Sequence, residues 1–326
     1  MKQCVGGKGT GIPNKEPLQL PRHIAWRRQY DMRRYARHLS QAELNQRIRD
    51  ILLNLLGVNA EGQLSLEPLW AEKWTHVLEE MQLRHGPYPA GFTRETLHSD
   101  PEPFPDFASE LAYKAALRLS SIGLNRGSVF IKFGERKYME PLYESGALRI
   151  QPATYFAQSN HNGAVRDNEL MLSVSLALSR DDIVKVVTNP QNVPSDAPEQ
   201  RLDVKFESPT DYWVYCVTNS LKPRLFVDFK ADACVIIRDR ARFSRMLSDS
   251  SRLRLRAAAM FEGPAVYVDP LLPITSTIFV PFAKYFGYSY QDEQRFCWLP
   301  SVPVKKVTYL DLQIGSLKEF SDLIVL

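Results

Sequence analysis

Three polar side chains near the C-terminal end of the chain have types and spacing that could support catalysis. In the stretch KYFGYSYQDEQRF, residues 284–296, Gln291, Glu293 and Arg295 alternate with other residues. If this stretch is a strand, all three share one face. Arg295 would then hold the Glu293 carboxylate ionised and oriented. The other interpretation is an edge-strand face in water, where such a pair contributes well under about 1 kcal/mol.

A second pair of acids could bind a metal ion. Asp167 and Glu169 lie two residues apart, and with Glu293 or Asp269 they could hold Mg²⁺ for nuclease chemistry. The chain lacks the D-(x)n-E-x-K arrangement that would support this, since Leu170 and Met171 follow Glu169. A metal-dependent nuclease is therefore the lesser alternative.

Other catalytic and metal-binding patterns are missing from the sequence. The cysteines lie too far apart for paired zinc ligands, and the six histidines never fall into H-x-x-x-H spacing. We therefore expect no structural metal, and thiols that act as small buried hydrophobes. The chain also has no G-x-S-x-G nucleophile elbow, no dinucleotide-binding G-x-G-x-x-G after a strand, and no kinase motifs.

Length and composition indicate a folded chain of one or two domains. The 326 residues are 44% hydrophobic and 24% charged, which excludes a wholly disordered chain. No apolar run approaches the roughly 20 residues that span a bilayer. The N-terminus MKQCVGGKGTG lacks the apolar core of a secretion signal. These features predict a cytoplasmic protein with no membrane partner.

Arginine is unevenly distributed, although the net charge is only +4. One cluster lies within residues 22–50 and includes Arg27, Arg28, Arg33 and Arg34; a second runs over residues 238–256. Arginine clusters can bind phosphate backbones through bidentate hydrogen bonds, but they also form ordinary solvated helix faces. Both interpretations stay open at this point.

The elements that position these residues fall into two regions. The composition of residues 1–20 predicts a flexible tail. Residues 21–120 are expected to form an Arg-rich helical region. Ser40 and Glu43 form a capping box before an apolar stripe that ends at Gly57, and residues 66–86 and 107–120 predict further helices. The segment 86–106 is rich in proline and glycine and predicts a linker.

From about residue 125 to 326 the pattern predicts an α+β region. A short helix over 136–146, stopped by Gly146, separates two of the expected strands. Strands are expected at 128–134, 147–152, 170–178, 211–218, 233–239, 265–269, 276–282 and 294–300.

The order of these features resembles the ADP-ribosyltransferase superfamily, particularly its toxin and nucleic-acid-directed branches. In that family a basic residue on the first strand precedes a helix of the form nLxxILxxG, and here KYMEPLYESG follows Lys132. An aromatic turn then leads to Gln/Glu-x-Glu, which GYSYQDE matches in form. The resemblance covers about residues 128–300 and implies a split β-sheet domain, with NAD as a substrate.

The resemblance assigns roles to individual residues. Glu293 corresponds to the catalytic glutamate and Gln291 to the substrate-selecting position. Lys132 and Tyr155 would hold NAD, and Tyr155 or Tyr288 could stack on the nicotinamide ring. Ser276 and Arg295 complete the predicted cofactor-binding residues. For the central strand of the family, the candidates are Tyr155 with Thr275, Ser276 and Thr277, or Ser173 and Ser175.

Two departures separate this chain from the family pattern. Toxins of the family have arginine on the first strand and other branches histidine, whereas this chain has Lys132. Ser276 also lies close to Gln291 for the intervening strand and loop. The chain is similar as well to an uncharacterised bacterial family with a late YQxExR strand, which implies no known chemistry.

These observations predict an NAD-dependent ADP-ribosyltransferase or NAD glycohydrolase-like enzyme. Glu293 would stabilise the oxocarbenium character that develops when the nicotinamide–ribose bond breaks. The family suggests a toxin or antiviral defence effector acting on a macromolecule such as nucleic acid or a nucleoprotein complex, with a protein partner on the N-terminal helices. The alternative is a non-catalytic nucleic-acid- or protein-binding module that uses the arginine clusters.

Overall fold

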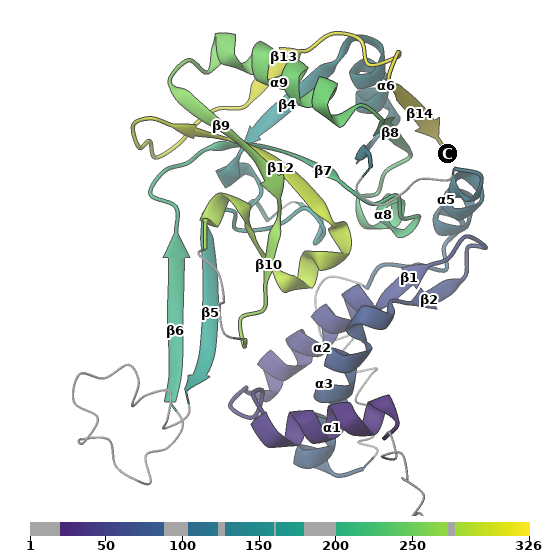
Figure 1. Cartoon of the computed structure of the whole chain (residues 1–326), viewed down its shortest axis with the longest axis vertical. Helices are drawn as coiled ribbons and strands as arrows, with labels where there is room; N and C mark the ends of the chain where they lie inside the picture. The colour runs from purple at the N-terminus through teal and green to yellow at the C-terminus, as the bar shows by residue number, and fades with distance from the viewer. Residues whose placement is uncertain (1–19, 88–103, 123–127, 160, 179–199, 273–277) are drawn as a thin grey trace, which may run out of the picture.

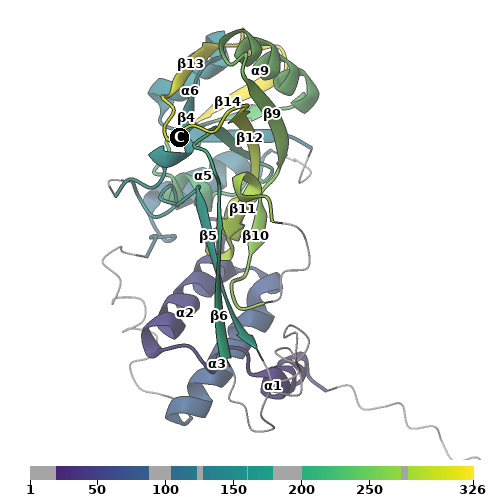
Figure 2. The same cartoon turned by 90° about the vertical axis from the view of Figure 1, so that its left-hand side faces the viewer.

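The chain folds into a helical region and a sheet-containing body, which lie at opposite ends of the molecule (Figures 1 and 2). The computed structural model describes residues 20–87, 104–122, 128–159, 161–178, 200–272 and 278–326. The architecture is mixed α/β, and all pairings within the main sheet are antiparallel. Within the part of the chain just given, no helix is long and apolar enough to cross a membrane.

The helical region is built from three helices and a small hairpin. Its elements are α1 (Arg22–Arg33), α2 (Gln41–Leu55), β1 (Leu56–Val58), β2 (Leu64–Leu66), the 3-10 turn η1 (Pro68–Trp70) and α3 (Ala71–His85). Helix α2 begins with the predicted capping box, in which Ser40 and Glu43 exchange hydrogen bonds. Its apolar side packs in one cluster with α1 and α3, which gives the region its own core.

The main sheet of the body has six strands in one path and two that branch from it. The path runs β13 (Leu310–Gln313), β4 (Ala147–Pro152), β7 (Trp213–Thr218), β3 (Phe130–Gly134), β8 (Ala233–Ile237) and β14 (Ser321–Val325). Strand β12 (Glu293–Pro300) pairs with β7 and with β9 (Ala258–Pro264). Strand β7 is therefore the junction of the sheet.

Two smaller pairs of strands complete the body. Strands β5 (Met171–Leu178) and β6 (Gln200–Glu207) form an antiparallel pair that extends from the sheet toward the helical region (Figure 1). Strands β10 (Val266–Val268) and β11 (Ala283–Tyr285) pair in parallel. Two 3-10 turns flank β11, namely η4 (Val280–Phe282) and η5 (Phe286–Gln291), and η5 leads directly toward β12.

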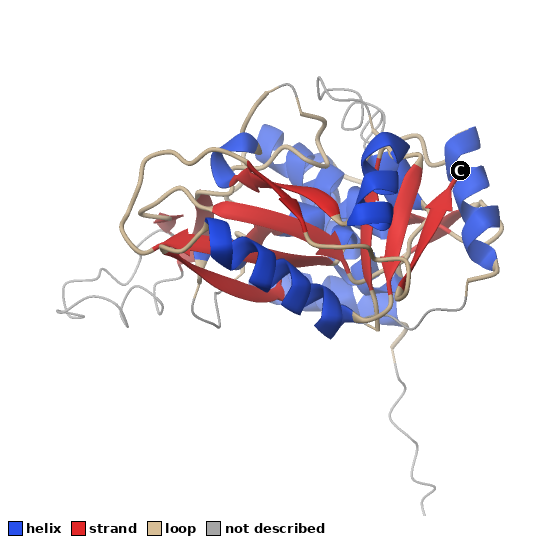
Figure 3. Ribbon diagram, turned by 90° about the horizontal axis from the view of Figure 1, so that it is seen from above, coloured by secondary structure: helices blue, strands red, loops and turns tan. Residues whose placement is uncertain are grey.

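Helices pack against the strands, as the view from above shows (Figure 3). They are α5 (Glu110–Ser120), α6 (Arg136–Ser145), α8 (Arg224–Asp228) and α9 (Arg240–Arg254). The core beneath α9 is aromatic: Phe243 packs edge-on against Phe130 and Phe296. Helix α5 shares a core cluster with β3 and β8, so its apolar face is buried in the body.

The helix-glycine-strand element of the sequence forms as expected. Helix α6 ends at Gly146, whose φ of 68° lies in the left-handed region, and β4 follows at once. A Cβ at Gly146 would lie 2.2 Å from the Gly315 carbonyl oxygen, so only glycine fits this close approach. The expected strand at 276–282 is wrong in its described part, because Val280–Phe282 form the turn η4.

Candidate functional site

The sheet opens along one edge of β7. Strand β4 pairs with the start of β7, with Gln151 opposite Val214, and β3 pairs only with its end, with Ile131 opposite Thr218. The intervening segment, Tyr215–Val217, has no ladder partner on this side among these paired strands. The opening leaves backbone hydrogen-bonding groups of β7 without a neighbouring strand, and such groups need another partner.

Lys132 supplies one of those partners. Its Nζ donates a 2.7 Å hydrogen bond to the backbone carbonyl of Cys216 and lies 4.6 Å from the centre of the Tyr215 ring. Burial lowers the pKa of Lys132, whereas Cys216 and Glu293 act in the opposite direction. The lysine therefore occupies the opening of the sheet and does not extend into solvent.

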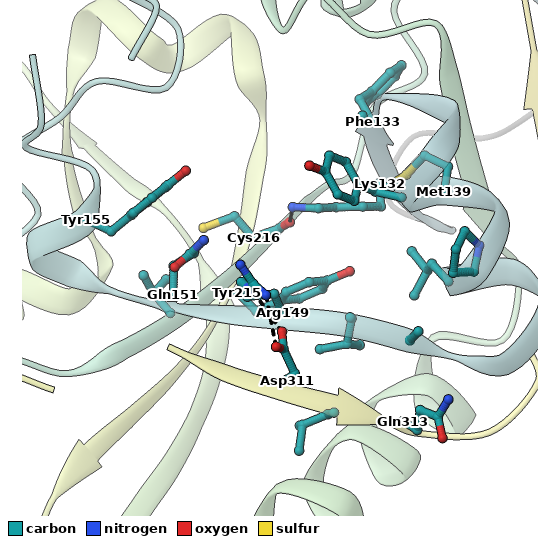
Figure 4. Close-up of a pocket in the computed structure, with 18 of the residues that line it drawn as sticks. Lys132, Phe133, Met139, Arg149, Gln151, Tyr155, Tyr215, Cys216, Asp311 and Gln313 are labelled. Atoms are coloured by element: carbon teal, nitrogen blue, oxygen red, sulfur yellow. Dashed lines mark hydrogen bonds and ion pairs between the residues drawn. The ribbon is translucent and has the colours of Figure 1, made fainter. Parts of the chain in front are cut away.

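A cleft of about 900 Å³ lies at this opening, at the upper end of the volumes typical of ligand sites (Figure 4). Its walls come from β3, α6, β4, β7 and β13 and from the end of α9. The charged side chains that line it are Lys132, Lys137, Arg149, Arg254 and Asp311. Asp311 pairs with Arg149 at 2.7 Å, and the other three charged residues of the lining are cationic. The lining therefore has an excess of positive charge, which favours an anionic ligand.

Tyr155 lies in the same cleft as Lys132. It ends the 3-10 turn η2 (Ala153–Tyr155) just after β4, and its side chain lies near Gln151 and Cys216 in the close-up (Figure 4). Phe156 packs edge-on against its ring, and His161 lies 4.3 Å from it, centre to centre. The structure therefore brings together the two residues predicted to hold NAD.

Glu293 lies at the start of β12 within a network of buried charges. Lys284 of β11 places its Nζ 2.7 Å from Glu293 Oε2, and Arg295 places its Nε 3.3 Å from Oε1. The Tyr267 hydroxyl accepts a 2.9 Å hydrogen bond from the backbone N–H of Glu293. Glu293 is 6% exposed and Arg295 is fully buried.

Strand alternation correctly predicts that Glu293 and Arg295 share a face, and it is wrong for Gln291. Gln291 ends η5, and Asp292 then adopts a left-handed conformation, with φ of 48°, before the strand begins. Gln291 nevertheless reaches the same network, because Lys284 Nζ donates a 3.0 Å hydrogen bond to its side-chain oxygen. Its amide nitrogen donates to the Ala164 carbonyl at 2.7 Å, so both ends of the amide are occupied.

Arg295 connects this network to Glu169, which precedes β5. Its guanidinium makes two contacts with the Glu169 carboxylate, at 2.7 and 2.9 Å, and donates to the Pro281 carbonyl at 2.9 Å. Burial raises the pKa of Glu169, whereas Arg295 opposes that shift. Burial also tends to raise the pKa of Glu293, but Arg295 and Lys284 outweigh it and hold that pKa well below its usual range. Glu293 is therefore ionised, as carboxylates beside cations generally are.

Cys216 connects the cleft to the Glu293 network. It lines the cleft, and the register of β7 and β12 places it opposite Arg295. Its thiol contributes to lowering the pKa of Glu293. Burial raises the pKa of Cys216 well above its usual value, so the group stays a neutral thiol. Cys216 is thus a residue of the cleft lining that also interacts with the Glu293 carboxylate.

The remaining predicted ligand-binding residues lie elsewhere. Tyr288 of η5 donates its hydroxyl to the Arg166 carbonyl at 2.7 Å and is not among the residues that line the cleft. Arg295 is enclosed by Glu169 and Glu293, so it orients carboxylates and does not face the cleft. Ser276 lies outside the described residues.

The arginines of α1 are only partly available to a partner. Arg27 pairs with Glu79 at 3.2 Å, and Arg34 pairs with the buried Glu80 at 2.9 Å. Arg28 and Arg33 are exposed. Within the same cluster, Arg47 and Arg49 of α2 are buried, and the interpretation of the whole run as one solvated basic face is therefore wrong.

Two of the acids considered for a metal site, Asp269 and Glu169, are paired with cations. Asp269 forms ion pairs with Arg47 and Lys73, whereas Glu169 pairs with Arg295. Among the residues that the structure describes, no group of three or more histidine, cysteine or acidic side chains is arranged to hold a metal ion.

The sequence patterns did not point to Lys284 or Tyr267, and they suggested Glu169 only as a ligand in the lesser, metal-dependent alternative. Lys284 is the first residue of the stretch that carries Gln291 and Glu293, so a search for a cation near a catalytic acid could have found it. Tyr267 has no such signal, because only the pairing of β10 with β11 brings it to Glu293. Comparisons of this chain with protein-family models, with curated proteins and with solved structures gave no significant match.

Proposed function

We propose that this chain cleaves NAD⁺ at the nicotinamide–ribose bond and passes ADP-ribose to an acceptor or to water, as the resemblance to ADP-ribosyltransferases implies. The observation that carries the proposal is the opening of the sheet between β3 and β4. It forms a cleft lined by Lys132, Tyr155 and Cys216, and the Cys216 thiol influences the pKa of the Glu293 carboxylate. A carboxylate near such a cleft supports the proposal, because it can stabilise positive charge on the ribose.

The charge of the cleft suits a dinucleotide. A diphosphate is an anion, and the cleft is lined by four cationic side chains and one carboxylate. Lys132 meets phosphate oxygens as a point charge, without the forked geometry of arginine. Tyr155 offers a flat ring to the nicotinamide, with Phe156 and His161 supporting it.

The ionised state of Glu293 suits the proposed step. The bond between the ribose carbon and the nicotinamide nitrogen breaks, and nicotinamide leaves with the bonding electrons as a neutral molecule. Positive charge develops on the ribose, where a preorganised carboxylate stabilises it. Water or an acceptor then forms the new bond to that carbon and releases a proton to solvent. A carboxylate has about four acceptor positions, so Glu293 keeps capacity for a ribose hydroxyl beside Lys284, Arg295 and Cys216.

Gln291 has a different role in this proposal from that of an acceptor-selecting residue. Its amide is occupied by the Ala164 carbonyl and by Lys284. We assign it to holding Lys284 beside Glu293. The identity of the acceptor is then decided by surfaces around the cleft.

The test is nicotinamide release from NAD⁺ by the purified full chain, alone and with DNA, RNA or cell lysate. Wild type is compared with Glu293→Gln, and Glu319→Gln is the matched control because Glu319 pairs with Arg242 on the surface. The proposal expects release by wild type and by the control, and its loss in folded Glu293→Gln. Equal release by all three proteins, or release by none under any of these conditions, contradicts it.

A second candidate function is binding of nucleic acid through α1. The exposed Arg28 and Arg33 favour it, and Met32 between them is 83% exposed. Phosphate contacts by arginine give binding that weakens steeply with salt. Loss of RNA or DNA binding in Arg28→Ala with Arg33→Ala, with retained nicotinamide release, would assign α1 to target recruitment. Salt-independent binding that the double variant retains would exclude this role.

A further inference from the structure

Two of the partners of Glu293, Lys284 and Tyr267, come from a segment that lies outside the main sheet. Tyr267 lies on β10 and Lys284 on β11, and these strands pair with each other outside the main sheet. Gln291 ends η5, which follows β11 without a break. The position of this segment therefore decides where Lys284 and the Tyr267 hydroxyl meet the carboxylate.

Helix α2 of the helical region contacts this segment through polar side chains. The Asn54 side-chain nitrogen donates hydrogen bonds to the backbone carbonyls of Phe286 and Gly287, at 3.3 and 2.9 Å. The Tyr285 hydroxyl donates a 2.6 Å hydrogen bond to Asp50. Each contact joins α2 to a residue between Lys284 and Gln291.

A third contact fixes the other end of the segment. Arg47 makes two hydrogen bonds to Asp269, at 2.9 and 3.0 Å, just after β10 ends. The guanidinium carbon of Arg47 also lies 5.0 Å from the centre of the Phe286 ring. The spacing of Arg47, Asp50 and Asn54 is three and four residues, which places them on one side of the helix.

All three α2 side chains are buried, with exposed fractions of 3%, 4% and 2% for Arg47, Asp50 and Asn54. Hydrogen bonds away from water hold their geometry, and removal of one partner leaves the other unsatisfied. A helix interface used only for packing would bury apolar side chains at these positions. The buried polar contacts instead specify one position of η5 relative to α2.

We propose that Asn54 and Asp50 of α2 are positioning residues for the Glu293 site. They fix Tyr285 and η5, and through them Lys284 and Gln291 beside the carboxylate. This role rests on the proposed NAD⁺ cleavage, for which the site must be preorganised. Through Asn54 and Asp50, the helical region becomes a structural part of the active site.

The experiment compares Asn54→Leu with Leu44→Ala in the full chain. Leucine at position 54 removes both hydrogen bonds with little change in size, whereas Leu44→Ala opens a cavity in the same helix, within the core of the helical region. The measurements are thermal unfolding, the kcat and KM for nicotinamide release, and hydrogen–deuterium exchange of peptides that cover 284–296.

Asn54→Leu is expected to raise exchange across 286–293 and to lower kcat by about 10- to 100-fold with little change in KM, because small displacements of catalytic groups are costly. Leu44→Ala, assayed below its unfolding temperature, is expected to keep wild-type kcat. Wild-type kcat in Asn54→Leu, or unchanged exchange across 286–293, overturns the proposal. Absence of release in wild type overturns the proposed function instead, and the exchange comparison then still decides whether Asn54 anchors η5.

Discussion

The Nζ of Lys284 lies 2.7 Å from the Glu293 carboxylate in a site where both side chains are almost fully buried. The lysine also holds Gln291, so one ammonium group orders two of the polar residues of this site. A buried carboxylate without a cation takes up a proton near neutral pH. Lys284 and Arg295 keep Glu293 in the ionised form that the proposed chemistry requires.

Substitution of Lys284 by methionine should therefore change the pH dependence of catalysis. Without the ammonium, burial raises the pKa of Glu293, and the carboxylate becomes protonated at a higher pH. The acid limb of kcat/KM against pH should move upward in Lys284→Met. Lys318→Met, which removes a surface lysine paired with Glu144, is the control. An unchanged profile in Lys284→Met would show that Glu293 ionisation is not required.

Lys132→Met should weaken both the fold around the cleft and ligand binding. It leaves the Cys216 carbonyl without the hydrogen bond from Nζ, at a cost of about 1–3 kcal/mol of unfolding free energy. It also removes a cation from the cleft lining. Lys132→Arg keeps the charge and should retain more affinity for NAD⁺ than Lys132→Met. Calorimetric titration and chemical unfolding measure both effects, and equal affinity in the two variants would contradict the role of the charge.

The stability of the chain should depend on Asp50 in mildly acidic solution. Burial raises the pKa of Asp50 from 3.8 to about 6, although Tyr285, Gln46, Arg47 and Arg49 oppose the shift. The folded chain thus binds this proton more tightly than the unfolded chain, and the Asp50 contribution to stability falls as pH rises from about 4 to 6.

Asp50→Asn keeps an acceptor for Tyr285 and removes the charge. It should match wild type near pH 4 and become more stable above pH 6, by at most about 3 kcal/mol. Thermal unfolding of both proteins between pH 4 and 7 measures the difference. A difference that does not change with pH would show that Asp50 does not titrate in this range.

Arg295 and Glu169 should contribute to the free energy of unfolding mainly through their interaction with each other. Removal of one partner leaves the other buried group without its charge-assisted hydrogen bonds, which costs about 1–3 kcal/mol. Glu169→Gln and Arg295→Met should each destabilise the chain, and the double variant should recover part of the loss. A double-mutant cycle from denaturant unfolding measures the coupling. Strict additivity would show that the two side chains do not interact.

Local patterns in the sequence predicted the elements around the site correctly. The capping box at Ser40, the glycine stop at Gly146 and the alternation of Glu293 with Arg295 each depend on neighbouring residues alone. These three features follow from short-range geometry. Lys132 and Tyr155 also line one cleft, but their proposed role as NAD ligands came from the family resemblance and stays a prediction.

Long-range pairing accounts for what the sequence did not show. Gln291 lies outside the predicted strand because Asp292 adopts a left-handed backbone conformation. Alternation of side chains does not predict such a conformation. In the sequence, Arg47 has the pattern of a surface arginine. In the structure it pairs with Asp269, which lies 222 residues away in the sequence. Glu169 resembled a metal ligand because its partner Arg295 lies 126 residues away in the sequence. Buried ion pairs of this kind depend on the tertiary fold.

The most direct test is the rate of nicotinamide release from NAD⁺ by wild type and by Glu293→Gln, with folding of both verified by circular dichroism. We expect measurable release by wild type and a loss of about 100-fold or more in the variant, the effect typical of removing one preorganised electrostatic group. Release by Glu293→Gln at the wild-type rate would contradict the assignment of Glu293 as the group that stabilises the transition state.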